Sequence, residues 1–202
     1  MSSFDVDYPI ECDDEYWKPN GDLGQAFQQP CGKTSAITTF VYQLKLCEIL
    51  AYALRTLYAT KKSKIKLGLI GNDGEHRIVA ELDSSLNKWK DSLPEIRKSC
   101  KYSLQLNPLK SLIIVRWDPN QKDSTFFNHT VLLYSTFFYI QIQVHRPFLT
   151  KKSDLSLVSL AICTNAARSC IHLLEVALTR GLALSPIIFV ELVLFTYVSC
   201  DN

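Results

Sequence analysis

The sequence predicts an all-α fold, a helical bundle or solenoid-like array of about five helices with an irregular N-terminal segment. Apolar residues recur at helical spacing over most of the chain after residue 35, and capping or turn residues separate these runs. Alternating strand patterns are scarce. The short run Leu112-Ile113-Ile114-Val115 is β-prone, and one such run makes no sheet by itself. The 202 residues are enough for one domain with a substantial core.

An irregular lead segment is expected at residues 1–35. It is rich in Asp, Pro and Gly and shows little helical period. Prolines and glycines mark turns in it, as in Lys18-Pro19-Asn20-Gly21. The chain therefore divides into this lead segment and a helical region at residues 36–202.

Two helices are expected before residue 95. The first begins after Thr34-Ser35, which can cap it, and ends near Thr60. The lysine-rich residues 61–66 follow at its end, where positive charge complements the helix dipole. The second begins at Asn72, which with Glu75 forms a capping-box-like start, and Pro94 closes it. The apolar stripe of the first helix comprises Ile37, Phe40, Val41, Leu44, Cys47, Leu50, Leu54, Leu57 and Tyr58. The stripe of the second comprises Val79, Leu82, Leu86, Trp89 and Leu93.

Three more helices are expected after residue 120. One runs from Asp123-Ser124 to His145, and Pro147 stops it. The next begins at Ser153-Asp154 and ends at Gly181. The last begins at Ser185-Pro186 and is apolar nearly all round, so it needs burial on several sides. The stripe of the helix that ends at His145 comprises Phe127, Val131, Tyr134, Phe138 and Ile142. The stripe of the helix that ends at Gly181 comprises Leu157, Leu160, Ala161, Thr164, Ala167, Ile171, Leu174 and Leu178.

Charge, cysteine content and charge patterning argue against several classes of function: self-sufficient nucleic-acid binding, disulfide-bonded folds, structural zinc sites and membrane binding. The net charge is only +2, from 22 basic and 20 acidic residues, whereas a self-sufficient nucleic-acid binder carries a strong basic patch. The seven cysteines form no CxxC pair, so we expect a reducing compartment without disulfides or structural zinc. Residues 124–144 lack charge but contain polar side chains that are costly in lipid, so no membrane partner is expected.

The densest acidic cluster is Asp13-Asp14-Glu15. It could hold Mg²⁺ in an all-α enzyme, although such motifs need spaced acids on one helix face and a second set opposite. A solvated or helix-capping acidic turn is the other interpretation. The four histidines are isolated, and no serine or cysteine stands in a nucleophile motif. The sequence therefore predicts no catalytic residues, metal site or cofactor in this chain.

Asn165 and Arg168 stand three residues apart and are neighbours on one helix face. We expect a buried, hydrogen-bonding structural role, with Arg168 paired to Glu175 or to an acid from another segment. Transmission of an effector signal is the alternative.

Several short motifs follow one another along the chain: Asp5-Val6-Asp7-Tyr8-Pro9, Asp13-Asp14-Glu15-Tyr16-Trp17, Leu54-Arg55-Thr56-Leu57-Tyr58, Val79-Ala80-Glu81-Leu82-Asp83-Ser84, Arg116-Trp117-Asp118-Pro119, His145-Arg146-Pro147-Phe148 and Asn165-Ala166-Ala167-Arg168. In this order they resemble the middle regulatory region of fungal zinc-cluster transcription factors, in the subgroup related to xylanolytic activators. Each motif is modest, and the ordered set is specific.

The resemblance implies an all-α domain that regulates transcription in the nucleus. DNA and zinc would be bound only by a separate six-cysteine module, which this chain lacks, and the expected partner is an effector or a regulatory protein. Dimerisation stays open. The residues that the family signature marks as structural or regulatory are Asp13, Asp14, Glu15, Tyr16, Trp17, His145, Arg146, Pro147, Asn165, Ala166, Ala167 and Arg168.

The chain also departs from the family pattern. The first helices of the regulatory region are absent, so a truncated domain is expected. Residues 97–115 form an insertion relative to the family pattern. In the family, the motif that matches Leu93-Pro94 is followed almost directly by the motif that matches Arg116-Trp117. A retained intron and a genuine surface loop both explain this insertion. A degenerate coding fragment without a stable fold is a further alternative.

Overall fold

The computed structural model describes residues 6–17, 27–30, 35–69, 71–93, 117–151 and 153–182, and all regular elements within them are helical. This confirms the all-α prediction. The insertion at 97–115 and the helix expected from Ser185 lie outside the described residues. The elements in chain order are the 3₁₀ turn η1 (Asp14–Tyr16), α1 (Ala36–Thr56), α2 (Lys61–Lys66), α3 (Asn72–Ser92), α4 (Ser124–His145), the 3₁₀ turn η4 (Arg146–Phe148) and α5 (Leu155–Thr179).

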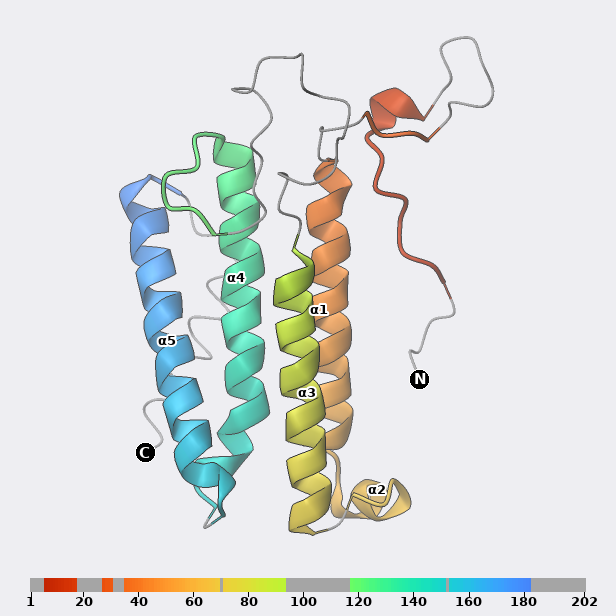
Figure 1. The fold of residues 1–202 in the computed structure, drawn as a ribbon, viewed down its shortest axis with the longest axis vertical. Coiled ribbons are helices and arrows are strands. Elements are labelled where there is room, and N and C mark those ends of the chain that lie inside the picture. Colours follow the sequence, from red (N-terminus) through yellow and green to blue (C-terminus); the bar gives the residue numbers. More distant parts are fainter. Residues whose placement is uncertain are drawn as a thin grey trace.

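The four long helices lie side by side as a bundle, with α4 in the middle (Figure 1). Helix α4 packs against α1, α3 and α5, and α1 also packs against α3. Helix α5 lies at one edge and packs mainly against α4 and η4. The described part of the chain is therefore a bundle.

The core fills the space between α1, α3 and α4 and continues to α5. Trp89 of α3 stacks on Phe137 of α4, with ring centroids 5.5 Å apart. It also meets Tyr42 of α1 edge to face, and its indole N–H donates to the Tyr42 carbonyl at 3.0 Å. The most completely buried apolar side chains come from all four long helices: Leu46, Leu82, Leu86, Val131, Leu133, Ile140, Val144 and Leu173.

Local capping chemistry explains where α1 and α2 begin and end. Ser35 caps α1 as predicted, because its side chain accepts from the Ile37 N–H. The helix ends at Thr56, four residues before the predicted end. Thr60 then caps a separate helix, α2, in which the lysine cluster lies. The prediction that these lysines merely follow the first helix was wrong, because the Thr60 hydroxyl accepts from the Ser63 N–H and starts a new turn.

Backbone conformation, and not a side-chain cap, sets both ends of helix α3. The predicted capping box was wrong: Gly71 occupies the cap position with φ of 90°, and Asn72 is already the first helical residue. At the other end Leu93 is extended, with φ −59° and ψ 126°. That conformation is the one the residue before a proline favours, and Pro94 follows in the sequence.

Helices α4 and α5 follow their predicted bounds closely. The Asp123 carboxylate accepts from the N–H groups of Thr125 and Phe126 and so caps α4. The side-chain cap predicted for α5 was wrong, because Asp154 makes no capping hydrogen bond. At its C-terminus Gly181 adopts a φ of +74°, which suits glycine. Its N–H donates to Leu178, and the Leu182 N–H donates to Ala177, which is the hydrogen-bond pattern of a Schellman stop.

The predicted buried face of α5 was mostly wrong. Small residues face the bundle, which lets α5 approach α4 closely; the buried set is Ser159, Cys163, Ala166, Cys170, Leu173, Leu174 and Ala177. Leu160, Ile171 and Leu178 were predicted to be buried, yet each remains more than half exposed. On α1, likewise, Phe40 and Leu54 point outward, while Tyr42, Leu46 and Ala53 are buried. Both helices carry apolar residues on two faces, so periodicity alone does not identify the buried one.

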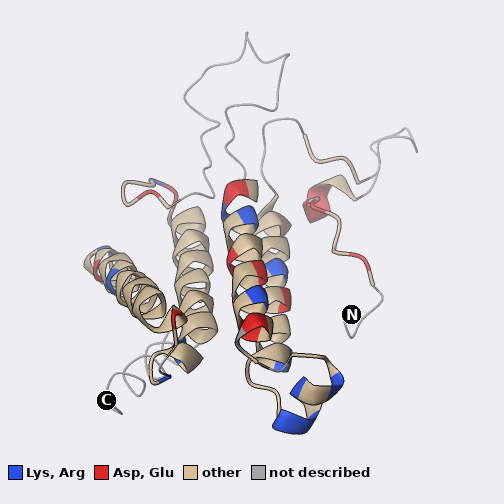
Figure 2. Cartoon of the chain, turned by 60° about the horizontal axis from the view of Figure 1, so that its bottom comes forward, with Lys and Arg blue, Asp and Glu red and all other residues tan. Residues whose placement is uncertain are grey.

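Charge is distributed unevenly over the bundle. Figure 2 shows Lys and Arg gathered on α2 and both signs along α3, while α4 carries no charged residue. Helices α1 and α5 are long and apolar enough to cross a membrane, judged by length and composition, and about a third of each apolar window (33%) is buried. Core helices of soluble proteins pass the same test, so this is weak evidence for a membrane protein.

Candidate functional site

A buried polar network joins three helices at the C-terminal end of α4. His145 Nε2 lies 3.0 Å from the Asp83 carboxylate of α3, and His145 Nδ1 lies 3.1 Å from the Ser159 hydroxyl of α5. His145 is 1% exposed and Ser159 is 0% exposed. These three residues are called the His145 network here, and the Asp83 side chain is its most exposed member, at 33%.

The chain turn between α4 and α5 positions this network. His145 is the last residue of α4, and Pro147 lies in η4, where the chain reverses direction. Ser159 follows early in α5, so the returning helix brings its hydroxyl back to the imidazole. Asp83 comes from the middle of α3. The network therefore fixes how the α4–α5 hairpin sits against α3.

The protonation pattern follows from the partners. An ionised carboxylate only accepts hydrogen bonds, so Nε2 of His145 carries the proton directed at Asp83. In the neutral imidazole Nδ1 then accepts from the Ser159 hydroxyl. Serine, histidine and aspartate form the same trio as in nucleophilic catalysis, but the Ser159 hydroxyl is sealed from solvent and no substrate atom could reach it. The arrangement is suited to holding helices together.

A second, partly buried contact lies close to the network. The Tyr58 hydroxyl, just after α1, donates to the backbone carbonyl of Gln143 at 2.9 Å and also lies 3.1 Å from its side-chain oxygen. Burial raises the pKa of Tyr58 to about 12, against the opposing positive charge of Arg146. This hydrogen bond ties the C-terminal end of α1 to the same end of α4.

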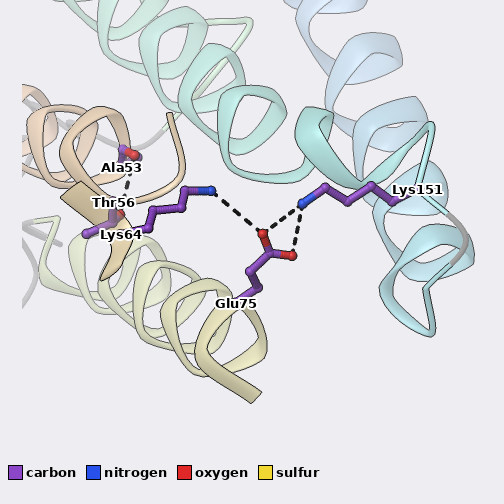
Figure 3. Close-up of polar contacts among 5 residues, drawn as sticks. All are labelled: Ala53, Thr56, Lys64, Glu75 and Lys151. Atoms are coloured by element: carbon purple, nitrogen blue, oxygen red, sulfur yellow. Dashed lines mark hydrogen bonds and ion pairs between the residues drawn. The ribbon is translucent and has the colours of Figure 1, made fainter. Parts of the chain in front are cut away.

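A three-residue ion cluster lies at the surface of this end of the bundle. Lys151 Nζ donates to both carboxylate oxygens of Glu75 at 2.8 and 2.9 Å, and Lys64 Nζ lies 3.7 Å from one of them (Figure 3). The three side chains come from the segment after η4, from α3 and from α2. Lys151 is 42% exposed, so solvent screens the pairs, and each contributes about 0–1 kcal/mol.

The acidic cluster of the lead segment has a capping role. One oxygen of the Asp13 carboxylate accepts from the Ser35 hydroxyl and from the Ala36 N–H, both at 2.8 Å. The other accepts from the Gln29 side-chain amide at 3.0 Å. This anion at the N-terminus of α1 complements the helix dipole. Of the two interpretations of Asp13-Asp14-Glu15, the helix-capping one is confirmed for Asp13.

The same geometry weakens the magnesium interpretation. Both oxygens of Asp13 already accept hydrogen bonds, so a cation would have to displace them. Asp14 and Glu15 are exposed in η1. Among the residues whose placement is given, no group of three or more His, Cys, Asp or Glu side chains could hold a metal ion.

Replacing Asp13 by alanine is expected to lower the free energy of unfolding by about 1–2 kcal/mol, because α1 loses an N-terminal acceptor and the lead segment loses its anchor. Urea denaturation followed by circular dichroism measures this. Asp14→Ala is the matched control, because Asp14 is exposed, and it should change stability by less than about 0.5 kcal/mol. Equal losses in the two variants would contradict the capping role.

The predicted signature residues do not converge on one site. Asp13 lies at the N-terminal end of α1 and His145 at the C-terminal end of α4, at opposite ends of the bundle (Figure 1). The buried role predicted for Asn165 and Arg168 was wrong, because both side chains are exposed. Among the described residues, no ion pair joins Arg168 to Glu175. Two other signature residues make structural contacts. Trp17 donates to the Cys12 carbonyl at 3.2 Å, and Ala166 packs with Ile142 and Cys163 in a small apolar cluster between α4 and α5.

The thiols of the described residues differ sharply in environment. Cys47 is exposed on α1, whereas burial raises the pKa of the Cys163 thiol on α5 to about 11. Iodoacetamide should therefore label Cys47 of the folded chain well before Cys163, because the thiolate is the reactive form. Peptide mass spectrometry over a labelling time course measures both sites. The two should react at similar rates in concentrated urea, and similar rates without urea would contradict the buried position of Cys163.

Two members of the His145 network, Asp83 and Ser159, were not predicted from the sequence as its partners. Asp83 lies within one of the family-like motifs and Ser159 within an apolar run, and neither position carries a local signal of a hydrogen bond to a residue far along the chain. Comparisons of this chain with protein-family models, with curated proteins and with solved structures find no match.

Proposed function

We propose that this chain is a helical regulatory domain of the fungal zinc-cluster type, which modulates DNA-templated transcription in the nucleus. The observation that supports it best is the role of two signature groups. Asp13 anchors the lead segment to α1, and His145 locks the α4–α5 hairpin to α3. Motif residues that join elements are what a scaffold without catalytic chemistry requires.

In this proposal the domain acts by binding an effector or a regulatory protein. Zinc and DNA belong to a separate six-cysteine module, and this chain holds no cofactor. The low net charge of +2 suits a domain that leaves DNA binding to another module. The apolar outer faces of α1 and α5 are surfaces on which a protein partner could be bound.

A tethering experiment tests the proposal. The chain is fused to an unrelated DNA-binding module in a fungal cell, and expression of a reporter gene behind the matching site is measured. We expect expression to differ from that given by the module alone. The His145→Leu fusion, whose bundle is destabilised, should return to the level of the module alone, and the Asp14→Ala fusion should behave like the unchanged chain. A folded chain that leaves reporter expression unchanged would refute the proposal.

A further inference from the structure

Helix α2 stands apart from the bundle. It projects at the end where α3 begins, and none of the other described elements packs extensively against it (Figure 1). Every residue from Lys61 to Gly68 is exposed except Lys64, which pairs with Glu75. The positive charge of this segment is visible in Figure 2. Helix α2 therefore contributes little to the core and forms a surface of its own.

Both ends of this short helix are nevertheless fixed. Thr60 caps its start. At the other end Gly68 has a φ of +66°, and its N–H donates to the Ile65 carbonyl at 3.1 Å, while the Leu69 N–H donates to the Lys64 carbonyl at 2.9 Å. This is the pattern of a Schellman stop, and the Leu69 side chain is buried in the core. A helix of six residues is not stable by itself, so these contacts hold its side chains in one arrangement.

The arrangement is an apolar centre with a cationic rim. Ile65 is 52% exposed. Lys61 and Lys62 precede it by four and three residues, and Lys66 follows Lys62 by four, so the four side chains are neighbours on the helix surface. They are called the α2 patch here. Within the part of the chain that the structure describes, no ion pair joins these three lysines to an acidic side chain. Their charges are therefore open to a partner.

The charges of the α2 patch also oppose each other. Like charges four residues apart, such as Lys62 and Lys66, destabilise a helix. Glu75 compensates Lys64 but not these two. Carboxylates of a partner would relieve the repulsion, and an apolar side chain between them would cover Ile65. We infer that the α2 patch binds an acidic segment of a partner protein that carries an apolar anchor residue. For its biological role this inference rests on the proposed function, in which the domain binds a regulatory protein.

Other occupants match the α2 patch less well. Leu67 is 55% exposed, but it stands two positions from Ile65 and so lies about 200° away around the helix, where the two side chains cannot enter a bilayer together. Nucleic-acid phosphates would attract the lysines, but that attraction is electrostatic and makes no use of Ile65. A second copy paired by two-fold symmetry on this patch would bring lysines against lysines. An acidic segment with an apolar anchor complements both the rim and the centre.

Fluorescence anisotropy on the full chain tests the inference. The probe is a fluorescein-labelled peptide in which Asp and Glu alternate with Leu. We expect it to bind, with an affinity that falls as salt is added, because the lysines are exposed and screened by solvent ions. One matched peptide has Asn and Gln in place of the acids, and a second has Ala in place of Leu. Each should bind about tenfold more weakly or worse, because each lacks one of the two complementary features.

Charge-matched variants locate the binding surface. Lys62→Glu combined with Lys66→Glu should weaken binding of the probe by about tenfold or more. Lys88→Glu combined with Lys122→Glu is the control, because it changes the net charge equally at exposed lysines near the end of α3 and the start of α4 (Figure 1). This control should stay within about twofold of the unchanged chain. Ile65→Ala should weaken binding several-fold without changing charge. Circular dichroism checks that each variant folds.

Equal losses in the two double variants would show attraction by net charge alone and overturn the inference. No binding of the probe, or an Ile65→Ala variant that binds as well as the unchanged chain, would overturn it too. So would tighter binding to phosphatidylserine vesicles or to duplex DNA than to the peptide. A tethered chain that changes reporter expression while the purified chain binds no acidic peptide would overturn this inference and leave the proposed function standing. Peptide binding without a reporter effect would refute only the proposed function.

Discussion

Replacing Trp89 by alanine is expected to lower the free energy of unfolding by about 3–5 kcal/mol, the largest effect of any single change proposed for this chain. The indole is 4% exposed and lies at the meeting point of α1, α3 and α4. Its removal deletes the stack on Phe137, two edge-to-face contacts, with Tyr42 and Tyr134, and the hydrogen bond to the Tyr42 carbonyl. Thermal and urea unfolding followed by circular dichroism measure the loss.

Two further variants test how much of this loss of stability comes from the hydrogen bond and from the buried position of Trp89. Trp89→Phe keeps an aromatic ring against Phe137 but leaves the Tyr42 carbonyl without its indole donor, so we expect a smaller loss, about 1–2 kcal/mol. Trp17→Ala removes a half-exposed indole from the lead segment and should cost less than the Trp89→Ala change. Equal destabilisation by Trp89→Ala and Trp17→Ala would contradict the position of Trp89 in the core between α1, α3 and α4.

Replacing His145 by leucine is expected to cost about 3 kcal/mol, although leucine is apolar and close in size. The loss of stability comes from the two hydrogen-bond partners of His145. The fully buried Ser159 hydroxyl would lose the imidazole nitrogen, and the Asp83 carboxylate would lose its imidazole donor. Asp83 is one-third exposed and recovers part of its solvation from water, so most of the cost falls on Ser159.

A double-mutant cycle with Ser159→Ala isolates this coupling. Ser159→Ala in the unchanged background removes one hydrogen bond and should cost about 1 kcal/mol. In the His145→Leu background that hydrogen bond is already absent, so Ser159→Ala should cost less or even restore stability. Additive losses, with each change costing the same in both backgrounds, would mean that His145 and Ser159 do not interact.

Most helix bounds were predictable because their signals are local, although the end of α1 at Thr56 and the start of α2 after Thr60 were missed. Ser35, Asp123, Pro147 and Gly181 act on backbone groups within a few residues, and the structure has each of them where the sequence placed it. Gly71 was missed because a glycine cap leaves no side-chain signal to distinguish it from its polar neighbour.

The buried faces were not predictable to the same degree. On α5 the larger apolar residues, such as Leu160 and Ile171, mark the outer flank, while small residues such as Ser159 and Ala166 face α4. By hydrophobicity leucine is more readily buried than serine, but a close approach of two helices favours small side chains at the contact. That choice depends on the distance between α4 and α5, which no single helix encodes.

The candidate site was only partly predictable. The family resemblance pointed to His145 and Asp13, but their partners depend on tertiary structure. Asp83 stands 62 residues before His145, and Gln29 stands 16 residues after Asp13. Arg168 was expected to be buried because arginine amid aliphatic residues suggests a buried pair. The structure instead leaves Arg168 at the surface, because α5 buries only one of its own faces against the bundle and Arg168 lies on another.

The central position of α4 has a consequence for how the folded chain opens. Among the described elements, α4 touches each of the other long helices, whereas α5 packs mainly against α4 and the adjoining turn η4. Amide protons of α4 should therefore exchange with solvent deuterium only when the whole bundle unfolds, at a free energy equal to the global value. Helix α5 can detach while α1, α3 and α4 stay packed, so its amides should exchange through a smaller, partial opening, and these two protection levels divide the bundle into two cooperative units.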